Sequence, residues 1–218
     1  MSRNTFASVA AIALITFVQV SAGRADFIQN STGLASPDIT LTFNEVDIRV
    51  GTPITNQYAP FGIASTTNLF FTTDGMPIGL PHIGGARLNN FPVNTGPFLT
   101  PFSITFAQPL TGVAFAMITN PGISGFDALL DGGLVATADA PTDLTSTNNF
   151  FGFTNITFDR IVVRPGGINN AMALDNLQLQ FAPTAVPEPG TLALLMTAGP
   201  GLVLLLRLRK VGRAEPSR

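Results

Sequence analysis

Apolar and polar residues alternate with a period of two through the middle of the chain. Residues 39–43, 102–106 and 177–181 each place an apolar side chain at every second position. Successive side chains of a strand point to opposite faces of its sheet, so this pattern predicts strands with one buried face. Residues 113–118 are apolar without interruption, which predicts a strand that is covered on both faces.

Turn residues separate the predicted strands. Phe126, Ala128 and Leu130 alternate with less apolar neighbours, Asp131-Gly132-Gly133 follows, and the alternation resumes over residues 134–138. An Asp-Gly turn between two such segments predicts a β-hairpin. Helical periodicity is absent from residues 26–182, which we therefore predict to be an all-β domain with a jelly-roll or β-sandwich architecture.

The N-terminal segment has a different pattern. Arg3 precedes an apolar run without charge over residues 6–20, and small residues follow up to Ala22 or Ala25. A positive n-region, an apolar h-region and a small-residue cleavage site are typical of a secretory signal peptide. We therefore expect residues 1–25 to be a signal peptide and the domain to be exported.

A second long apolar segment lies near the C-terminus. Residues 183–190 form a Pro-rich linker, residues 191–208 are predicted to be a transmembrane helix, and residues 209–218 are a basic tail. A helix of 16 to 18 residues is about 24–27 Å long, slightly less than a bilayer core of about 30 Å. Flanking arginines can extend toward the headgroups and cover the difference. Positive residues after the span predict that the tail is cytoplasmic and that the domain lies outside; they are Arg207, Arg209 and Lys210.

The order of these C-terminal features resembles the sorting tail of PEP-CTERM proteins. A Pro-Glu-Pro motif precedes the apolar span and the basic cluster, and its residues are Val186, Pro187, Glu188, Pro189 and Gly190. The resemblance covers roughly the last 30 residues. It implies recognition by an exosortase, a membrane-embedded transpeptidase-like enzyme, and cleavage that releases the ectodomain or attaches it at the cell surface. Family members are typical of bacteria that build exopolysaccharide, so the resemblance implies exopolysaccharide as a partner. A plain membrane anchor would keep the topology without the processing.

Charge and composition narrow the functions of the domain. Residues 26–182 contain four Arg against eleven Asp and Glu, and the chain has no Cys and one His, His82. An acidic domain repels the phosphate backbone, so nucleic acid is excluded as a partner. A thiol nucleophile is absent, and a lone His in a Gly- and Pro-rich loop is more often a surface residue than a catalytic base. We therefore expect no catalytic residue.

Two carboxylates share the alternation of apolar strand residues. Glu45 follows the pattern of residues 39–43, and Asp175 has the parity of residues 177–181. A carboxylate on an inward face must be paired, hydrogen-bonded or bound to a metal. The order of residues 39–43, 57–63 and 174–177 resembles jelly-roll domains similar to carbohydrate-binding modules. In such modules the first and last strands are often close and often hold a structural calcium ion, so one interpretation is a calcium site at Glu45 and Asp175. Alternatively each accepts backbone N–H bonds or meets an arginine, or a bulge turns it outward.

Aromatic residues give only weak support for sugar binding. The chain has 18 Phe, no Trp and one Tyr, Tyr58, which we consider the candidate for stacking on a ligand. Three functions remain open at this point: an exosortase-sorted surface or matrix protein whose noncatalytic domain makes adhesive or polysaccharide contacts, a dedicated carbohydrate-binding module, and a secreted hydrolase.

Overall fold

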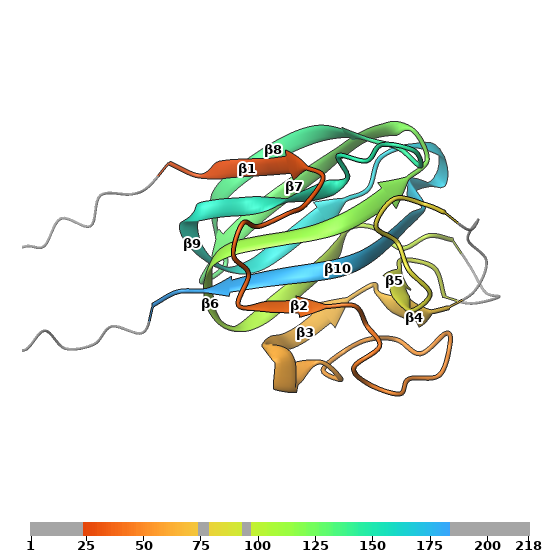
Figure 1. Cartoon of the computed structure of the whole chain (residues 1–218), viewed down its shortest axis with the longest axis horizontal. Helices are drawn as coiled ribbons and strands as arrows, with labels where there is room; N and C mark the ends of the chain where they lie inside the picture. Colours follow the sequence, from red (N-terminus) through yellow and green to blue (C-terminus); the bar gives the residue numbers. More distant parts are fainter. Residues whose placement is uncertain (1–23, 74–78, 93–96, 184–218) are drawn as a thin grey trace, which may run out of the picture. The chain divides into compact units, whose positions relative to one another are not determined.

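A computed structural model describes residues 24–73, 79–92 and 97–183 (Figure 1). The predicted signal peptide up to residue 23, the sorting motif, the apolar span and the basic tail lie outside the described residues. No helix within the described ranges is long and apolar enough to cross a membrane.

The described chain is all-β and antiparallel, as the alternation predicts. Two three-residue 3-10 turns, η1 (Ala59–Phe61) and η2 (Ile168–Asn170), are the helical elements of the described ranges. The ten strands are β1 (Asp26–Asn30), β2 (Ile39–Leu41), β3 (Ile63–Thr67), β4 (Phe70–Thr72), β5 (Arg87–Asn89), β6 (Phe102–Thr119), β7 (Gly122–Leu130), β8 (Gly133–Thr142), β9 (Phe150–Arg164) and β10 (Met172–Phe181). The predicted hairpin is present as β7 and β8.

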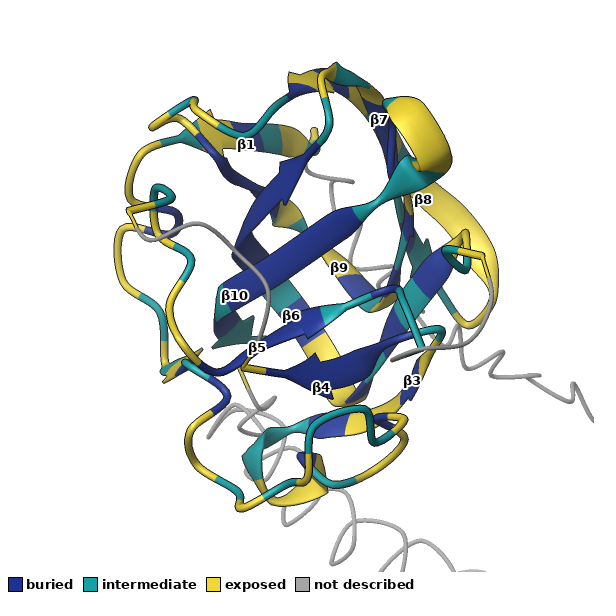
Figure 2. Ribbon diagram, turned by 90° about the vertical axis from the view of Figure 1, so that its right-hand side faces the viewer, coloured by how far each residue is buried: buried dark blue, intermediate teal, exposed yellow. Residues whose placement is uncertain are grey.

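Two long strands, β6 and β9, join the strands into a sandwich-like arrangement (Figures 1 and 2). The last part of β6 lies between β10 and the first part of β9, and β1 lies beyond β9. The first part of β6 lies between β3 and the last part of β9, and β7 and β8 lie beyond β9. Register shifts after Thr105 and Leu110 mark where β6 passes from one layer to the other.

The main core combines apolar side chains from both layers. Along β6 the inward residues are Phe102, Ile104 and Phe106 before the register shifts, and Val113, Phe115 and Met117 after them. The change from even to odd positions follows from the extra residues of the irregular segment, which reverse the direction of every later side chain.

The outer face of the β10–β6–β9 layer is also covered. Residues 113–118 are fully buried because their other side contacts a second apolar cluster, whose members are Ile28, Leu34, Ala114, Ala116 and Phe150, with Ile83 packed against them. Leu34 and Ile83 come from loops, so loop residues complete the burial. The prediction of a strand covered on both faces is confirmed.

Side chains of β10 hold both covering loops in place. Gln178 accepts a hydrogen bond from the backbone N–H of Leu34 at 2.6 Å and donates to the carbonyl of Thr32 at 3.0 Å. Asp175 and Asn176 hold the loop around Gly84 in the same way. Asp175, Asn176 and Gln178 therefore fix loops over the sheet.

Both ends of the described domain emerge at the same end of the sheet (Figure 1). Asp26 pairs with Thr154, Thr154 with Gly112, and Gly112 with Gln180. Three strand spacings of about 4.8 Å put the start of β1 roughly 14 Å from the end of β10.

Candidate functional site

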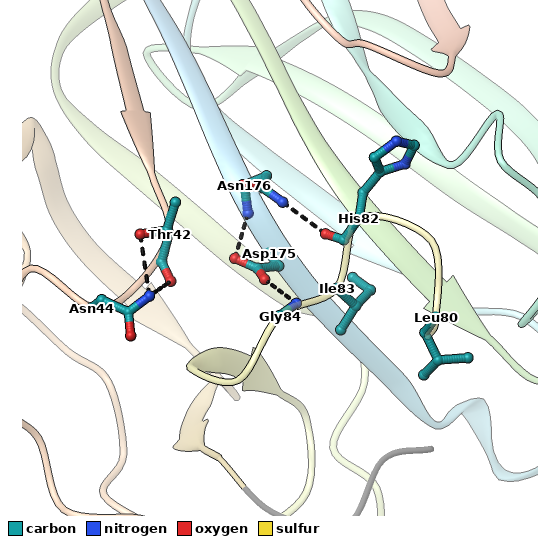
Figure 3. Close-up of a pocket in the computed structure, with 8 residues that line it drawn as sticks. All are labelled: Thr42, Asn44, Leu80, His82, Ile83, Gly84, Asp175 and Asn176. Carbon is teal, nitrogen blue, oxygen red and sulfur yellow. Dashed lines mark hydrogen bonds between the residues drawn. The ribbon is translucent and has the colours of Figure 1, made fainter. Parts of the chain in front are cut away.

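A pocket of about 400 Å³ lies over β10, between the segment that follows β2 and the loop that precedes β5 (Figure 3). Its lining residues are Thr42, Asn44, Leu80, His82, Ile83, Gly84, Asp175 and Asn176. Asp175 precedes Gln180 by five residues, or roughly 16 Å of extended strand. The pocket is therefore displaced along the sheet from the end where the domain's termini emerge.

A bulge in β10 directs Asp175 into this pocket. The pairing of β10 with β6 shifts register between Asp175 and Gln178, and Asn176 has a positive φ of 50°. Leu174 and Leu177 both belong to the main core although they are three residues apart. An added residue reverses the side-chain direction, so Asp175 faces away from the main core. The parity that Asp175 shares with residues 177–181 in the sequence is broken, as the bulge alternative predicts.

Both carboxylate oxygens of Asp175 accept backbone hydrogen bonds. The N–H of Gly84 donates to Oδ2 at 2.6 Å, and the N–H of Asn176 donates to Oδ1 at 2.7 Å. A Cβ at position 84 would lie 3.1 Å from Oδ2, so Gly84 allows this close approach. These contacts join the covering loop to the bulged strand.

Burial dominates the electrostatics of Asp175. The residue is 2% exposed, and loss of hydration raises the pKa of its carboxyl group to about 6. The two backbone N–H groups and the positive charge of Arg87 lower the pKa, whereas the charge of Glu45 raises it. The carboxylate is therefore ionised near neutral pH, but the groups that favour its negative charge offset only part of the cost of burying it.

Glu45 does not occupy the inward position that the alternation predicts. Strand β2 ends at Leu41, and Phe43 adopts a positive φ of 61°, so the chain turns before Glu45. The exposed Glu45 side chain folds back, and its Oε1 accepts hydrogen bonds from the N–H of Thr42 at 2.7 Å and its Oγ1 at 3.1 Å. An inward Glu45 requires a strand that continues unbroken from residue 39, and this condition is not met, although β2 and β10 do pair.

The predicted calcium site is not assembled by these residues. Within the described ranges, no group of three His, Asp or Glu side chains is arranged to hold a metal ion. Calcium takes six to eight oxygen ligands. Here donor N–H groups point at both oxygens of Asp175 and at Oε1 of Glu45.

Tyr58 belongs to the core and cannot stack on a ligand. The residue is 0% exposed, and its ring packs edge-on against Phe43 with 5.3 Å between centroids. Its hydroxyl donates to the carbonyl of Phe43 at 3.0 Å. Burial, and secondarily the charge of Glu45, raises the pKa of this hydroxyl well above its usual value. The sequence-based assignment of Tyr58 to ligand binding is wrong, and its role is to hold the turn that follows β2.

The lone histidine contributes its backbone more than its ring to the pocket. The carbonyl of His82 accepts a hydrogen bond from Asn176 Nδ2 at 2.7 Å. The ring Nδ1 lies 2.7 Å from Asn149 Oδ1, and Asn149 Nδ2 donates to the carbonyl of Pro81 at 2.7 Å. Since the amide oxygen can only accept, Nδ1 carries the proton. His82 is therefore a structural link between the loop and Asn149.

Several pocket residues have no signal in the strand alternation. Leu80, Ile83 and Asn44 lie in loops, where periodicity gives no direction for a side chain. Asn176 offers a signal in retrospect, because Asp-Asn within an apolar strand combines residues that disfavour strands and tolerate a left-handed backbone. Such a pair indicates a bulge, and a bulge redirects a side chain.

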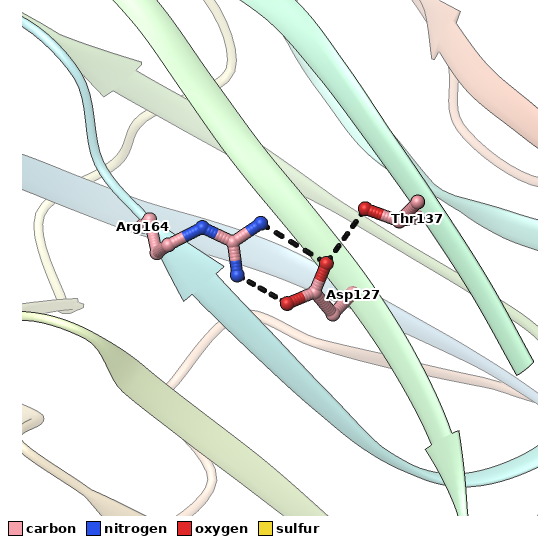
Figure 4. Close-up of polar contacts among 3 residues, drawn as sticks. All are labelled: Asp127, Thr137 and Arg164. Carbon is pink, nitrogen blue, oxygen red and sulfur yellow. Dashed lines mark hydrogen bonds and ion pairs between the residues drawn. The ribbon is translucent and has the colours of Figure 1, made fainter. Parts of the chain in front are cut away.

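A separate polar cluster lies on the β7–β8–β9 surface (Figure 4). The guanidinium of Arg164 forms a two-pronged ion pair with Asp127, and Thr137 donates to the same carboxylate at 2.8 Å. Hydrogen bonding from Arg164 lowers the pKa of Asp127. The three residues bond to one another across neighbouring strands, so this cluster stabilises the sheet surface.

Comparisons with models of known protein families, with curated proteins and with solved structures gave no match to this chain.

Proposed function

We propose that the protein is exported, is recognised by an exosortase through Pro187-Glu188-Pro189, and acts at the cell surface or in the extracellular matrix. Its β domain, for which we propose a jelly-roll topology, makes noncatalytic contacts with polysaccharide. The observation that carries the proposal is the order of motif, apolar span and basic cluster along the chain. In this order the Pro-Glu-Pro motif would lie outside the membrane, and the basic cluster would lie in the cytoplasm.

The layout of the domain supports contact with material away from its point of attachment. The start of β1 and the end of β10 lie at one end of the sheet, and the pocket at Asp175 lies farther along β10. The pairing of β2 with β10 supports the jelly-roll proposal, since early and late strands are neighbours in that topology.

The pocket favours binding over hydrolysis. Asp175 is the single carboxylate among its lining residues in the described ranges. Glycosidases generally need two carboxyl groups about 5–9 Å apart, one of them free to exchange a proton. Both oxygens of Asp175 are engaged by backbone N–H groups, which suits a fixed acceptor. The burial of Tyr58 removes the aromatic platform considered for a sugar, so a pocket with polar acceptors is the better binding surface.

Mass spectrometry of the native protein from its source cells tests the sorting part of the proposal. We expect a mature N-terminus near Asp26 and a C-terminus between Pro187 and Gly190. An intact chain ending at Arg218 in the membrane fraction would refute processing. Retention of the full-length protein on exopolysaccharide isolated from the same cells tests the contact role, and a protein that passes through unretained contradicts it.

A further inference from the structure

The pocket at Asp175 is rich in hydrogen-bond acceptors, and most of its side-chain donors are engaged. Thr42 Oγ1 donates to Glu45, Asn44 Nδ2 donates to the carbonyl of Thr42, and Asn176 Nδ2 donates to the carbonyl of His82. The amide oxygens of Asn44 and Asn176 accept no hydrogen bond from the described residues. One N–H of Asn176 Nδ2 remains available, so acceptors outnumber the available side-chain donors, and a ligand that supplies donors suits this pocket.

The negative charge of Asp175 indicates that the ligand carries a positive charge. Asp175 is almost fully buried, yet it lines the pocket, and Arg87 compensates its charge less than burial penalises it. A carboxylate oxygen has two lone pairs, so each oxygen of Asp175 keeps acceptor capacity beyond its one backbone bond. A primary ammonium group carries three donors, no acceptor and a positive charge. It would relieve the cost of the buried charge and form a charge-assisted hydrogen bond.

Shape and apolar surface indicate what carries the ammonium group. The pocket is open toward solvent, and its volume of about 400 Å³ leaves room for a sugar unit on the surface. Leu80 and Ile83 give the pocket an aliphatic wall, against which the C–H face of a sugar ring can pack. A lysine side chain would present one ammonium group but no hydroxyl donors for Asn44 and Asn176.

We propose that this pocket binds an amino sugar with a free amine, whose ammonium group contacts Asp175 and whose hydroxyls donate to the amide oxygens of Asn44 and Asn176. The inference rests on the proposed polysaccharide contact and names its ligand class: a polysaccharide that contains hexosamine units without N-acetyl groups. N-acetylation removes the charge and replaces two donors by a bulky acyl group, so the acetylated unit is rejected.

Isothermal titration calorimetry of the full-length protein with a glucosamine oligomer tests this inference. The matched ligand is an N-acetylglucosamine oligomer of equal length. We expect the glucosamine oligomer to bind at least about tenfold more tightly, the low end for a charge-assisted hydrogen bond. Equal affinities, or no binding of either oligomer, would overturn the proposal. A lysine peptide that binds as tightly as the glucosamine oligomer would overturn the assignment to a sugar.

Variants locate the binding to this pocket. Asp175→Asn removes the charge at nearly constant shape, and we expect it to abolish the preference for the free amine. Asp139→Asn makes the same change on an exposed residue of β8 and is expected to bind like wild type. If Asp175→Asn does not fold, Asn44→Ala tests the same pocket through an exposed side chain, with a few-fold loss expected. Unchanged binding in Asp175→Asn, or in Asn44→Ala where Asp175→Asn does not fold, refutes the site.

The pH dependence gives a second readout. The charged or titratable groups around Asp175 are Glu45, Arg87 and His82. Because the pKa of Asp175 lies at about 6 without ligand, we expect affinity for the glucosamine oligomer to fall as the pH decreases below 6. Affinity that is flat across this range contradicts a contact with Asp175. Retention on native exopolysaccharide together with failure of every glucosamine test would refute this inference and leave the proposed function intact.

Discussion

The buried carboxylate of Asp175 predicts an unusual dependence of stability on pH. Its pKa is about 6 in the folded protein, against an ordinary value of 3.8. The folded state therefore binds the proton more tightly than the unfolded state does. The stabilising contribution is fully present below pH 3.8 and is lost as the pH rises through 6. Two pKa units correspond to about 3 kcal/mol, of which roughly 2–3 kcal/mol should appear between pH 4 and pH 7.5.

A double difference isolates this effect from the other carboxylates. Urea unfolding gives the free energy of unfolding of wild type and of Asp175→Asn at both pH values. Asp127 and Asp143 have lowered pKa values, so their contributions run in the opposite direction and are lost as the pH falls. They occur in both proteins and cancel. We expect wild type to lose about 2–3 kcal/mol more than the variant on going from pH 4 to pH 7.5.

The sign of the double difference decides between two physical effects. Loss of hydration raises the pKa of Asp175, whereas hydrogen bonds from Gly84 and Asn176 lower it. A double difference of zero would mean that the two N–H groups fully offset burial. A value of the opposite sign would mean that they outweigh it, and the description of Asp175 as a poorly compensated charge would then be wrong.

Three further predictions concern other parts of the domain. Tyr58→Phe removes one buried hydrogen bond to the carbonyl of Phe43, so we expect the free energy of unfolding to fall by about 1–2 kcal/mol and the melting temperature by roughly 2–8 °C. Glucosamine binding should be unchanged, and a variant as stable as wild type would contradict the role of the hydroxyl. Asp127→Asn weakens a partly exposed ion pair, and thermal unfolding should show a loss of about 1 kcal/mol or less; a much larger loss would show that Arg164 depends on this partner. A calcium chelator should leave the melting temperature unchanged, and a fall that added calcium reverses would restore the calcium site that the present contacts argue against.

The sequence was most informative where burial follows the period of a strand. The alternation over residues 102–106 and the continuous apolar run over residues 113–118 correctly predicted the all-β class of the described domain and a strand covered on both faces. Asp131-Gly132-Gly133 correctly predicted the β7–β8 hairpin. These features depend on residues close together in the chain, so local patterns are sufficient to predict them.

The candidate site depended on irregularities that alternation cannot show. The chain turns at Phe43, before Glu45, and the bulge at Asn176 turns Asp175 away from the main core. The turn leaves Glu45 outside the sheet, and the bulge reverses the side-chain direction at Asp175 within β10. Tyr58 was misassigned for a related reason. It lies in a loop, where alternation does not indicate whether a side chain is buried.

By itself, the sequence determined the β class of the domain, its acidic charge and the order of motif, apolar span and basic cluster, because these are properties of neighbouring residues. Only the tertiary structure brought Gly84 to Asp175 and Asn44 to Asn176, across as many as 132 positions of the chain. It also decided that the pocket keeps acceptors while most of its side-chain donors are engaged. Hydrogen bonds between distant segments consume those donors, and no local pattern records which partner each donor finds.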